Sequence, residues 1–89
     1  MVTVHQIKSW PKYFEATLHG EKTAEFRRND RDYIEGDYLL MREWNPEKAE
    51  QKPYTGRYLL AKITHIMVPQ EPWIGIPPGH IILSIKVLD

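Results

Sequence analysis

The chain has 89 residues, a length that predicts a single domain over residues 1–89. Its 12 basic and 12 acidic residues balance, which argues against strong non-specific nucleic-acid binding, and the lack of cysteine excludes disulfides and thiolate metal sites. The first residues show neither a basic start nor a long apolar run, and no segment approaches the ~20 apolar residues of a membrane helix. We therefore expect a cytoplasmic protein that does not contact a membrane.

The first elements are a short strand and a short helix. Residues 5–7 favour a strand, and Ser9 is placed to cap a helix that has Pro11 in its first turn. One face of this helix follows the helical repeat, and Gly20 suits its end. That face consists of Trp10, Tyr13, Phe14, Thr17 and Leu18, of which Trp10 and Phe14 are predicted to enter the core.

The remaining elements are predicted to be strands. They cover residues 22–28, 38–44 after a turn at 35–37, 57–68 with a bend or bulge near His65, and 80–88 with strict alternation. Residues 45–54 and the proline-rich 69–79 are predicted loops. The fold class is therefore α+β, a small and mainly antiparallel barrel of about five or six strands with one amino-terminal helix packed on it.

The segment from Gly20 to Asp32 carries most of the chemistry, since eight of its thirteen residues are charged. A period of two places Glu25 and Arg27 on one strand face, with Thr23, and Phe26 on the other, with Ala24. This pattern is typical of a solvated strand face with ion pairs. It equally fits a small polar site in which Lys22, a carboxylate and an arginine surround an anionic or hydrogen-bonding ligand.

Further candidates lie beside this strand and at the strand ends. Asn29, Asp30 and Asp32 favour a turn, which leaves Arg28 and Arg31 as candidate phosphate contacts. Trp44 and Tyr54 fall at strand ends. Trp73 lies in the proline-rich loop, where it either plugs the barrel end or forms a platform on which a base stacks.

Several kinds of site are not expected. The four histidines show no metal-ligand spacing, and the chain has no serine or cysteine hydrolase motif and no glycine-rich phosphate loop. We expect neither a metal nor a cofactor.

Three short motifs resemble the ASCH domain, a β-barrel family related to the PUA fold. They are Gly20-Glu21-Lys22-Thr23, Arg27 and Gly36-Asp37, and they follow a short amino-terminal helix. The longer string that runs on through Arg42-Glu43-Trp44 and Tyr54-Thr55-Gly56 is similar to a small bacterial and phage branch of ASCH-like proteins without an assigned function. The resemblance covers nearly the whole chain.

The resemblance implies a PUA-like barrel that binds RNA or a modified nucleobase in a cleft between helix and barrel. The candidate binding residues are Lys22, Thr23, Glu25, Arg27, Arg28, Asn29, Arg31, Trp44 and Trp73. In such a cleft, Glu25 is predicted to lie between Lys22 and Arg27, shielded from water.

Two other functions stay open. Some bacterial ASCH proteins are amidohydrolases that deacetylate N4-acetylcytidine with a Lys, a Thr and a later Glu. Lys22 matches the Lys, Glu25 stands where the Thr would be, and Glu43 or Glu71 could supply the later Glu. In an enzyme, Lys22 would act as nucleophile or base and Glu25 would orient it. Alternatively, the loop that carries Trp73 could bind a protein partner.

Overall fold

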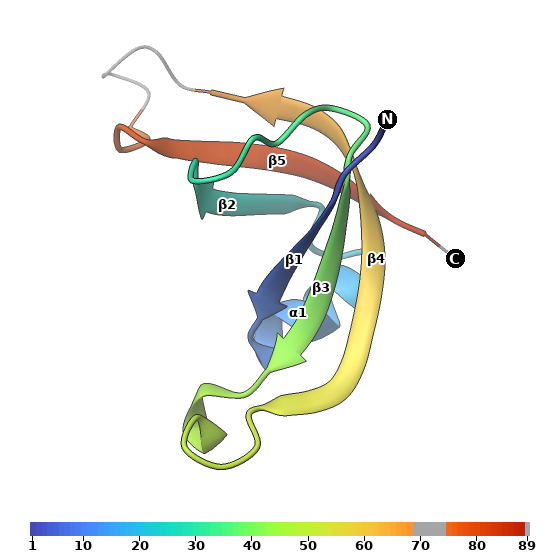
Figure 1. Cartoon of the computed structure of the whole chain (residues 1–89), viewed down its shortest axis with the longest axis vertical. Helices are drawn as coiled ribbons and strands as arrows, with labels where there is room; N and C mark the ends of the chain where they lie inside the picture. The colour runs from blue at the N-terminus through green and yellow to red at the C-terminus, as the bar shows by residue number, and fades with distance from the viewer. Residues whose placement is uncertain (69–74, 89) are drawn as a thin grey trace.

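The computed structural model describes residues 1–68 and 75–88 and shows an α+β fold. Five strands form one sheet in the order β1-β3-β4-β5-β2, which curls into a half-barrel (Figure 1). The elements are β1 (Val4–Ser9), α1 (Pro11–Leu18), β2 (Ala24–Arg28), β3 (Tyr38–Trp44), the 3₁₀ helix η1 (Pro46–Lys48), β4 (Tyr54–Met67) and β5 (His80–Val87). Three of the four strand pairings are antiparallel, as predicted, and β1 runs parallel to β3.

The core lies on the concave side of the curled sheet. Every second residue is buried there along β3 and along β5 up to Ile85, and in β4 the same alternation buries Leu59, Ala61 and Ile63. The largest buried apolar side chains are Phe14, Leu39, Met41, Ile63, Ile81 and Leu83. None of the helices in the described ranges is both long and apolar enough to cross a membrane.

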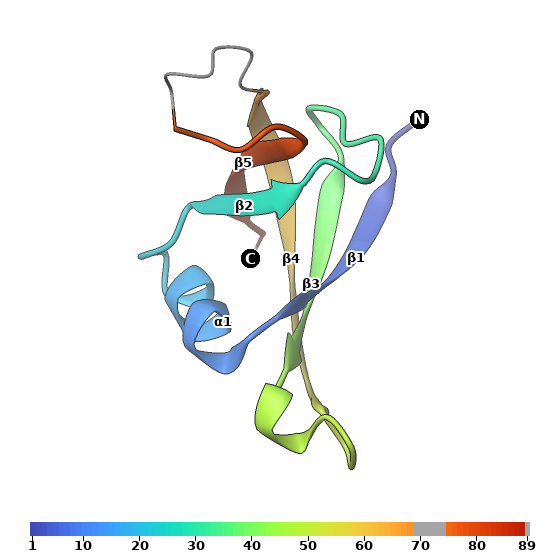
Figure 2. The same ribbon diagram turned by 90° about the vertical axis from the view of Figure 1, so that its left-hand side faces the viewer.

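A bulge in β4 contributes to the curl. The register with β5 shifts between Ile63, which faces Ile85, and His65, which faces Ser84. A bulge bends a strand and increases its twist, so the two halves of the sheet differ in direction, and β2 and β5 run across β1 and β3 (Figure 2). The sequence prediction of a bend or bulge near His65 is confirmed.

The helix α1 is shorter and less buried than predicted. Ser9 is not its cap, because Ser9 ends β1 and Trp10 occupies the cap position without a side-chain hydrogen bond. Pro11 begins the helix, where its missing N–H costs nothing. Phe14 is buried as predicted, and Thr17 is buried too, whereas Trp10 is 53% exposed and does not enter the core. The helix covers one edge of the core with Phe14 and Thr17 and leaves the Tyr13 side chain exposed.

The strand β2 turns its polar face inward. Glu25 is buried and Arg27 is half-buried, whereas Ala24 and Phe26 are exposed. Ordinary strands of this kind bury their apolar face. The inversion places charged groups on the inner side of the half-barrel, where water is partly excluded.

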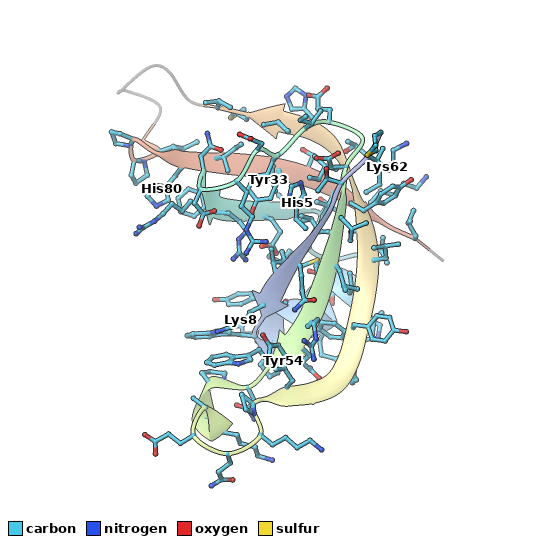
Figure 3. The ribbon with its side chains drawn as sticks, in the orientation of Figure 1. His5, Lys8, Tyr33, Tyr54, Lys62 and His80 are labelled. Atoms are coloured by element: carbon cyan, nitrogen blue, oxygen red, sulfur yellow. The ribbon has the colours of Figure 1, made fainter. Side chains whose placement is uncertain are left out.

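A buried polar cluster fixes the loop between β2 and β3. The Asp37 carboxylate accepts hydrogen bonds from the backbone N–H groups of Thr3 (3.0 Å) and Ile34 (3.2 Å) and lies 2.9 Å from His5 Nε2. These hydrogen bonds lower the pKa of Asp37 from its ordinary value, and the bond from Thr3 has the largest effect. The ring of Tyr33 packs on His5, with 4.8 Å between centroids (Figure 3).

Candidate functional site

A groove of about 600 Å³ lies between α1, the end of β1 and β2. Three sets of side chains line it: Lys8 and Ser9 from β1, Trp10 and Tyr13 from the start of the helix, and Lys22, Glu25, Phe26 and Arg27 from the turn after the helix and from β2. This volume falls within the range of small-molecule sites in proteins. The groove joins segments that are far apart in the sequence.

A glycine turn places Lys22 at the groove. Gly20 has a φ of +79°, a left-handed conformation that ends the helix and reverses the chain. The backbone N–H groups of Glu21 and Lys22 then both donate to the Ala16 carbonyl oxygen, at 2.9 and 3.0 Å. Lys22 is therefore held at the end of α1, immediately before β2 begins.

The centre of the groove is an ion triad of Lys22, Glu25 and Arg27. Glu25 is only 7% exposed; one of its carboxylate oxygens contacts Lys22 Nζ and the other lies 3.6 Å from Arg27 Nη1. Lys22 Nζ also donates to the Ala24 carbonyl oxygen at 2.6 Å. One buried carboxylate thus faces two half-buried cations, the arrangement that the sequence predicted for Glu25.

Arginine side chains bridge the gap between β2 and the free edge of β1. Arg31 Nη1 donates to the Gln6 carbonyl oxygen at 2.6 Å, and Arg27 Nη1 makes a longer contact of 3.5 Å with the Lys8 carbonyl oxygen. Among the described strands none pairs with these carbonyl groups, since β1 and β2 are the two ends of the sheet order, so the arginine side chains satisfy them. The two end strands of the half-barrel are therefore connected here through arginine side chains.

Tyr33 borders this bridge. Burial raises the pKa of Tyr33, and the positive charges of Arg27 and Arg31 act in the opposite direction. Its hydroxyl is buried and has no hydrogen-bond partner among the described residues.

Exposed aromatic side chains form the walls of the groove. Trp10, Tyr13 and Phe26 are 53%, 47% and 56% exposed, values that are high for residues of this size. Phe26 also stacks on the His80 ring, with 5.2 Å between centroids and 13° between planes. The groove therefore offers flat apolar surfaces on both the helix side and the β2 side.

The Ser9 hydroxyl lies unsatisfied in the groove lining. Ser9 is 5% exposed, and its Oγ has no hydrogen-bond partner within residues 1–68 and 75–88. Leaving a buried hydroxyl unpaired costs about 1–3 kcal/mol. A ligand or an ordered water that donates to or accepts from Ser9 would remove this cost.

The structure brings three of the sequence-predicted residues together and separates the others. Lys22, Glu25 and Arg27 line the groove. Thr23, Arg28 and Asn29 are exposed outside the groove lining, and Arg31 is bound to the β1 backbone. Trp44 lies at the end of β3 beneath Lys8, whose ammonium is 4.5 Å from the ring centroid, and Trp73 lies outside the described residues.

The groove also contains residues that the sequence did not single out as binding residues. These are Lys8, Ser9, Trp10, Tyr13 and Phe26. Trp10 and Tyr13 were assigned to one helical face with Phe14 and Thr17, and that pattern gave no sign that the Trp10 and Tyr13 side chains stay exposed. Phe26 was placed opposite the polar face of β2, although the groove reaches around the strand to it.

The candidate later glutamate occupies a different cluster. Glu43 is buried, accepts a 2.6 Å hydrogen bond from Thr55 Oγ1 and lies 3.7 Å from Arg57 Nε. It is not part of the groove lining. Glu71 lies outside the described residues. Among the described residues, no three His, Asp or Glu side chains are grouped in a way that could hold a metal ion.

The chain belongs to the family described as "Domain of unknown function (DUF3850)", which matches residues 4–85. The chain is also 42% identical over 66 residues to a protein of Escherichia phage P2 called "Uncharacterized 12.9 kDa protein in GpA 3'region". This similarity covers 74% of the chain and 56% of the phage protein, so the chain spans little more than half of that relative.

Proposed function

We propose that this domain binds single-stranded RNA or a modified nucleobase and holds one base in the groove between α1, β1 and β2. The observation that carries the proposal is the buried Glu25 carboxylate, which lies between two cations in a groove with exposed aromatic walls. Each part of this arrangement matches one part of a nucleotide.

The ion triad suits the polar edge of a base. A carboxylate has about four acceptor positions, and Lys22 and Arg27 do not occupy all of them. Glu25 can therefore accept a hydrogen bond from an exocyclic amino group, as carboxylates do with the N4 amino group of cytosine. Arg27 and Lys22 can donate to a neighbouring ring acceptor or carbonyl oxygen. We expect bases with an amino group to bind more tightly than uracil.

The aromatic walls suit the faces of a base. Stacking of a base on an aromatic side chain contributes about 1–3 kcal/mol where it occurs. Trp10, Tyr13 and Phe26 present such surfaces at the rim of the groove, and Lys8 lies beside them where the phosphate backbone of a strand could pass. This division of roles is typical of proteins that bind single strands.

The test compares cytidine, adenosine and uridine with the same protein by calorimetric or NMR titration. We expect cytidine and adenosine to bind more tightly than uridine, and Glu25→Gln to reduce this preference, because an amide offers a single acceptor oxygen and adds donors. Glu15→Gln is the matched control, since Glu15 is a half-exposed carboxylate outside the groove lining. Equal weak binding of all three nucleosides, or an equal effect of both substitutions, would contradict the proposal.

A second candidate function is the hydrolysis of an acylated base such as N4-acetylcytidine, favoured by the direct contact between Lys22 and Glu25. Lys22 donates to two oxygen acceptors, which suits its ammonium form, whereas nucleophilic attack needs the neutral amine. Binding is therefore our first choice. Incubation with N4-acetylcytidine, followed by chromatography, tests for turnover, and turnover that survives Lys22→Ala would dismiss a catalytic role for Lys22.

We also propose that the domain is related to the ASCH and PUA-like barrels. This is supported by the placement of the motif residues Lys22 and Arg27 in one groove and of Gly36-Asp37 at the start of β3. A superposition of an experimental ASCH structure on this fold tests the relationship, which requires the same strand order and the motif lysine at the same place.

A further inference from the structure

The outer surface of β1, β3 and the first half of β4 carries cations and aromatic rings, of which Lys8 also lines the groove. Strand alternation places one set of side chains opposite the core, and the strand register puts them in rows. Lys8, Arg42 and Tyr58 form one row across the three strands, and Trp44 faces Tyr54 in the next. We call this the outer face, defined by Lys8, Leu40, Arg42, Trp44, Tyr54 and Tyr58.

Each cation of the outer face lies over an aromatic ring. Lys8 Nζ lies 4.5 Å from the centroid of Trp44, and the guanidinium carbon of Arg42 lies 3.9 Å from the centroid of Tyr54. Figure 3 labels Lys8 and Tyr54 at the end of the sheet nearest η1. These distances are those of cation–π contacts, which position a cation without neutralising it.

The outer face contains no carboxylate. The three strands, all within the described part of the chain, include a single acidic residue, Glu43, and it is buried on the core side. No described residue forms a salt bridge with Lys8 or Arg42, whereas Lys22, Arg27 and Arg57 all have carboxylate partners. Although the formal net charge of the chain is zero, its charges are unevenly distributed, and the outer face carries cations that no carboxylate of the described residues neutralises.

We infer that the outer face is a second contact surface for the same single-stranded nucleic acid, so that a strand with one base in the groove continues across β1 and β3. The choice of a nucleic-acid occupant rests on the proposed function. Charge complementarity argues for a polyanion, and a guanidinium that lies over a tyrosine ring can still donate its N–H groups to a phosphate. The 70% exposed Tyr58 supplies a free ring for a further base.

Lys8 connects the two surfaces. It lines the groove and also belongs to the outer face, where it is paired in register with Arg42 on the adjacent strand. Neighbouring strands lie about 4.8 Å apart. A backbone that leaves the groove past Lys8 therefore meets Arg42 next, without crossing an acidic side chain of these strands.

The experiment measures the binding of a fluorescently labelled ten-nucleotide RNA of mixed sequence by anisotropy over a range of salt concentrations. Arg42→Gln is expected to weaken binding about 10-fold and to lower the slope of log K against log salt by about 0.7, the value for one phosphate contact to a single strand. Tyr58→Ala is expected to weaken binding about 5-fold or more while leaving the slope unchanged, because it removes stacking. Lys86→Gln, an exposed lysine on β5 outside the outer face, is the control and should change affinity less than 2-fold.

The outcomes separate this inference from the proposed function. If nucleosides do not bind the groove but RNA binding still depends on Arg42 and Tyr58, the outer face stands and the groove proposal fails. If RNA binds and neither substitution exceeds the Lys86→Gln control, or if no RNA binding occurs, the outer face is not a nucleic-acid surface. Heparin binding as tight as RNA binding, and independent of Tyr58, would also overturn the inference in favour of a general polyanion surface.

Discussion

Replacement of Glu25 by glutamine isolates the charge at the centre of the groove, because the two side chains have nearly the same shape. The substitution leaves Lys22 and Arg27 without their shared carboxylate. Breaking a fully buried ion pair costs about 3–5 kcal/mol, and an exposed pair is worth about 0–1 kcal/mol. Glu25 is buried, but the side chains of Lys22 and Arg27 are 26% and 29% exposed, so water reduces the cost. We expect a loss of about 2 kcal/mol in the free energy of unfolding.

Thermal and urea unfolding measure this loss. For a domain of this size, about 2 kcal/mol corresponds to a fall of about 8–16 °C in Tm. Glu15→Gln is the control, because Glu15 is 45% exposed in its 2.7 Å pair with Arg57 and should cost no more than about 1 kcal/mol. An unchanged Tm for Glu25→Gln, or equal losses for both variants, would show that Glu25 is merely a solvated strand residue.

Two further predictions concern the parts of the fold that support the groove. Asp37→Asn should destabilise the domain by about 3 kcal/mol, because the buried carboxylate accepts two backbone hydrogen bonds and contacts His5. Because the pKa of Asp37 is lowered in the native state, the stability that its charge contributes is fully present above the ordinary pKa of 3.8 and is lost as the pH falls through the lower native pKa. Urea unfolding at several acidic pH values should show this loss of stability in the original protein and not in Asp37→Asn. Phe26→Ala should cost about 1 kcal/mol or less in stability while weakening nucleoside binding, whereas Phe14→Ala should cost about 3–5 kcal/mol. Similar stability losses for the two phenylalanine variants would refute the placement of Phe26 in the groove wall.

Local pattern was sufficient to predict that the strands and the bend exist, although β4 begins at Tyr54, three residues before its predicted start. The alternation of residues 80–88 predicted a strand with alternating burial, and Gly20 predicted the end of the helix through its left-handed conformation. The bend or bulge that was predicted near His65 is the register shift between Ile63 and His65. These features depend on a few neighbouring residues, which the sequence contains in full.

The groove could not be predicted from local sequence pattern, because it is formed by contacts between segments that are distant in the sequence. Alternation in β2 separates Glu25 from Phe26, but it does not say which of them faces inward. The inward choice follows from the curl of the sheet, which brings Arg27 against the free edge of β1. Likewise, the helical spacing of Trp10 predicts that its side chain is buried. The helix is short, however, and only its Phe14 and Thr17 side chains are buried against the core. The parallel pairing of β1 with β3 is also set by tertiary structure.

The most direct test of the central claim is an NMR measurement of intermolecular nuclear Overhauser effects between cytidine and the aromatic side chains of the protein. If a base lies in the groove, the H5 and H6 protons of cytidine should show contacts with the ring protons of Trp10, Tyr13 or Phe26. Contacts with Tyr54 and Tyr58 alone, or none at a cytidine concentration that saturates binding, would contradict the account.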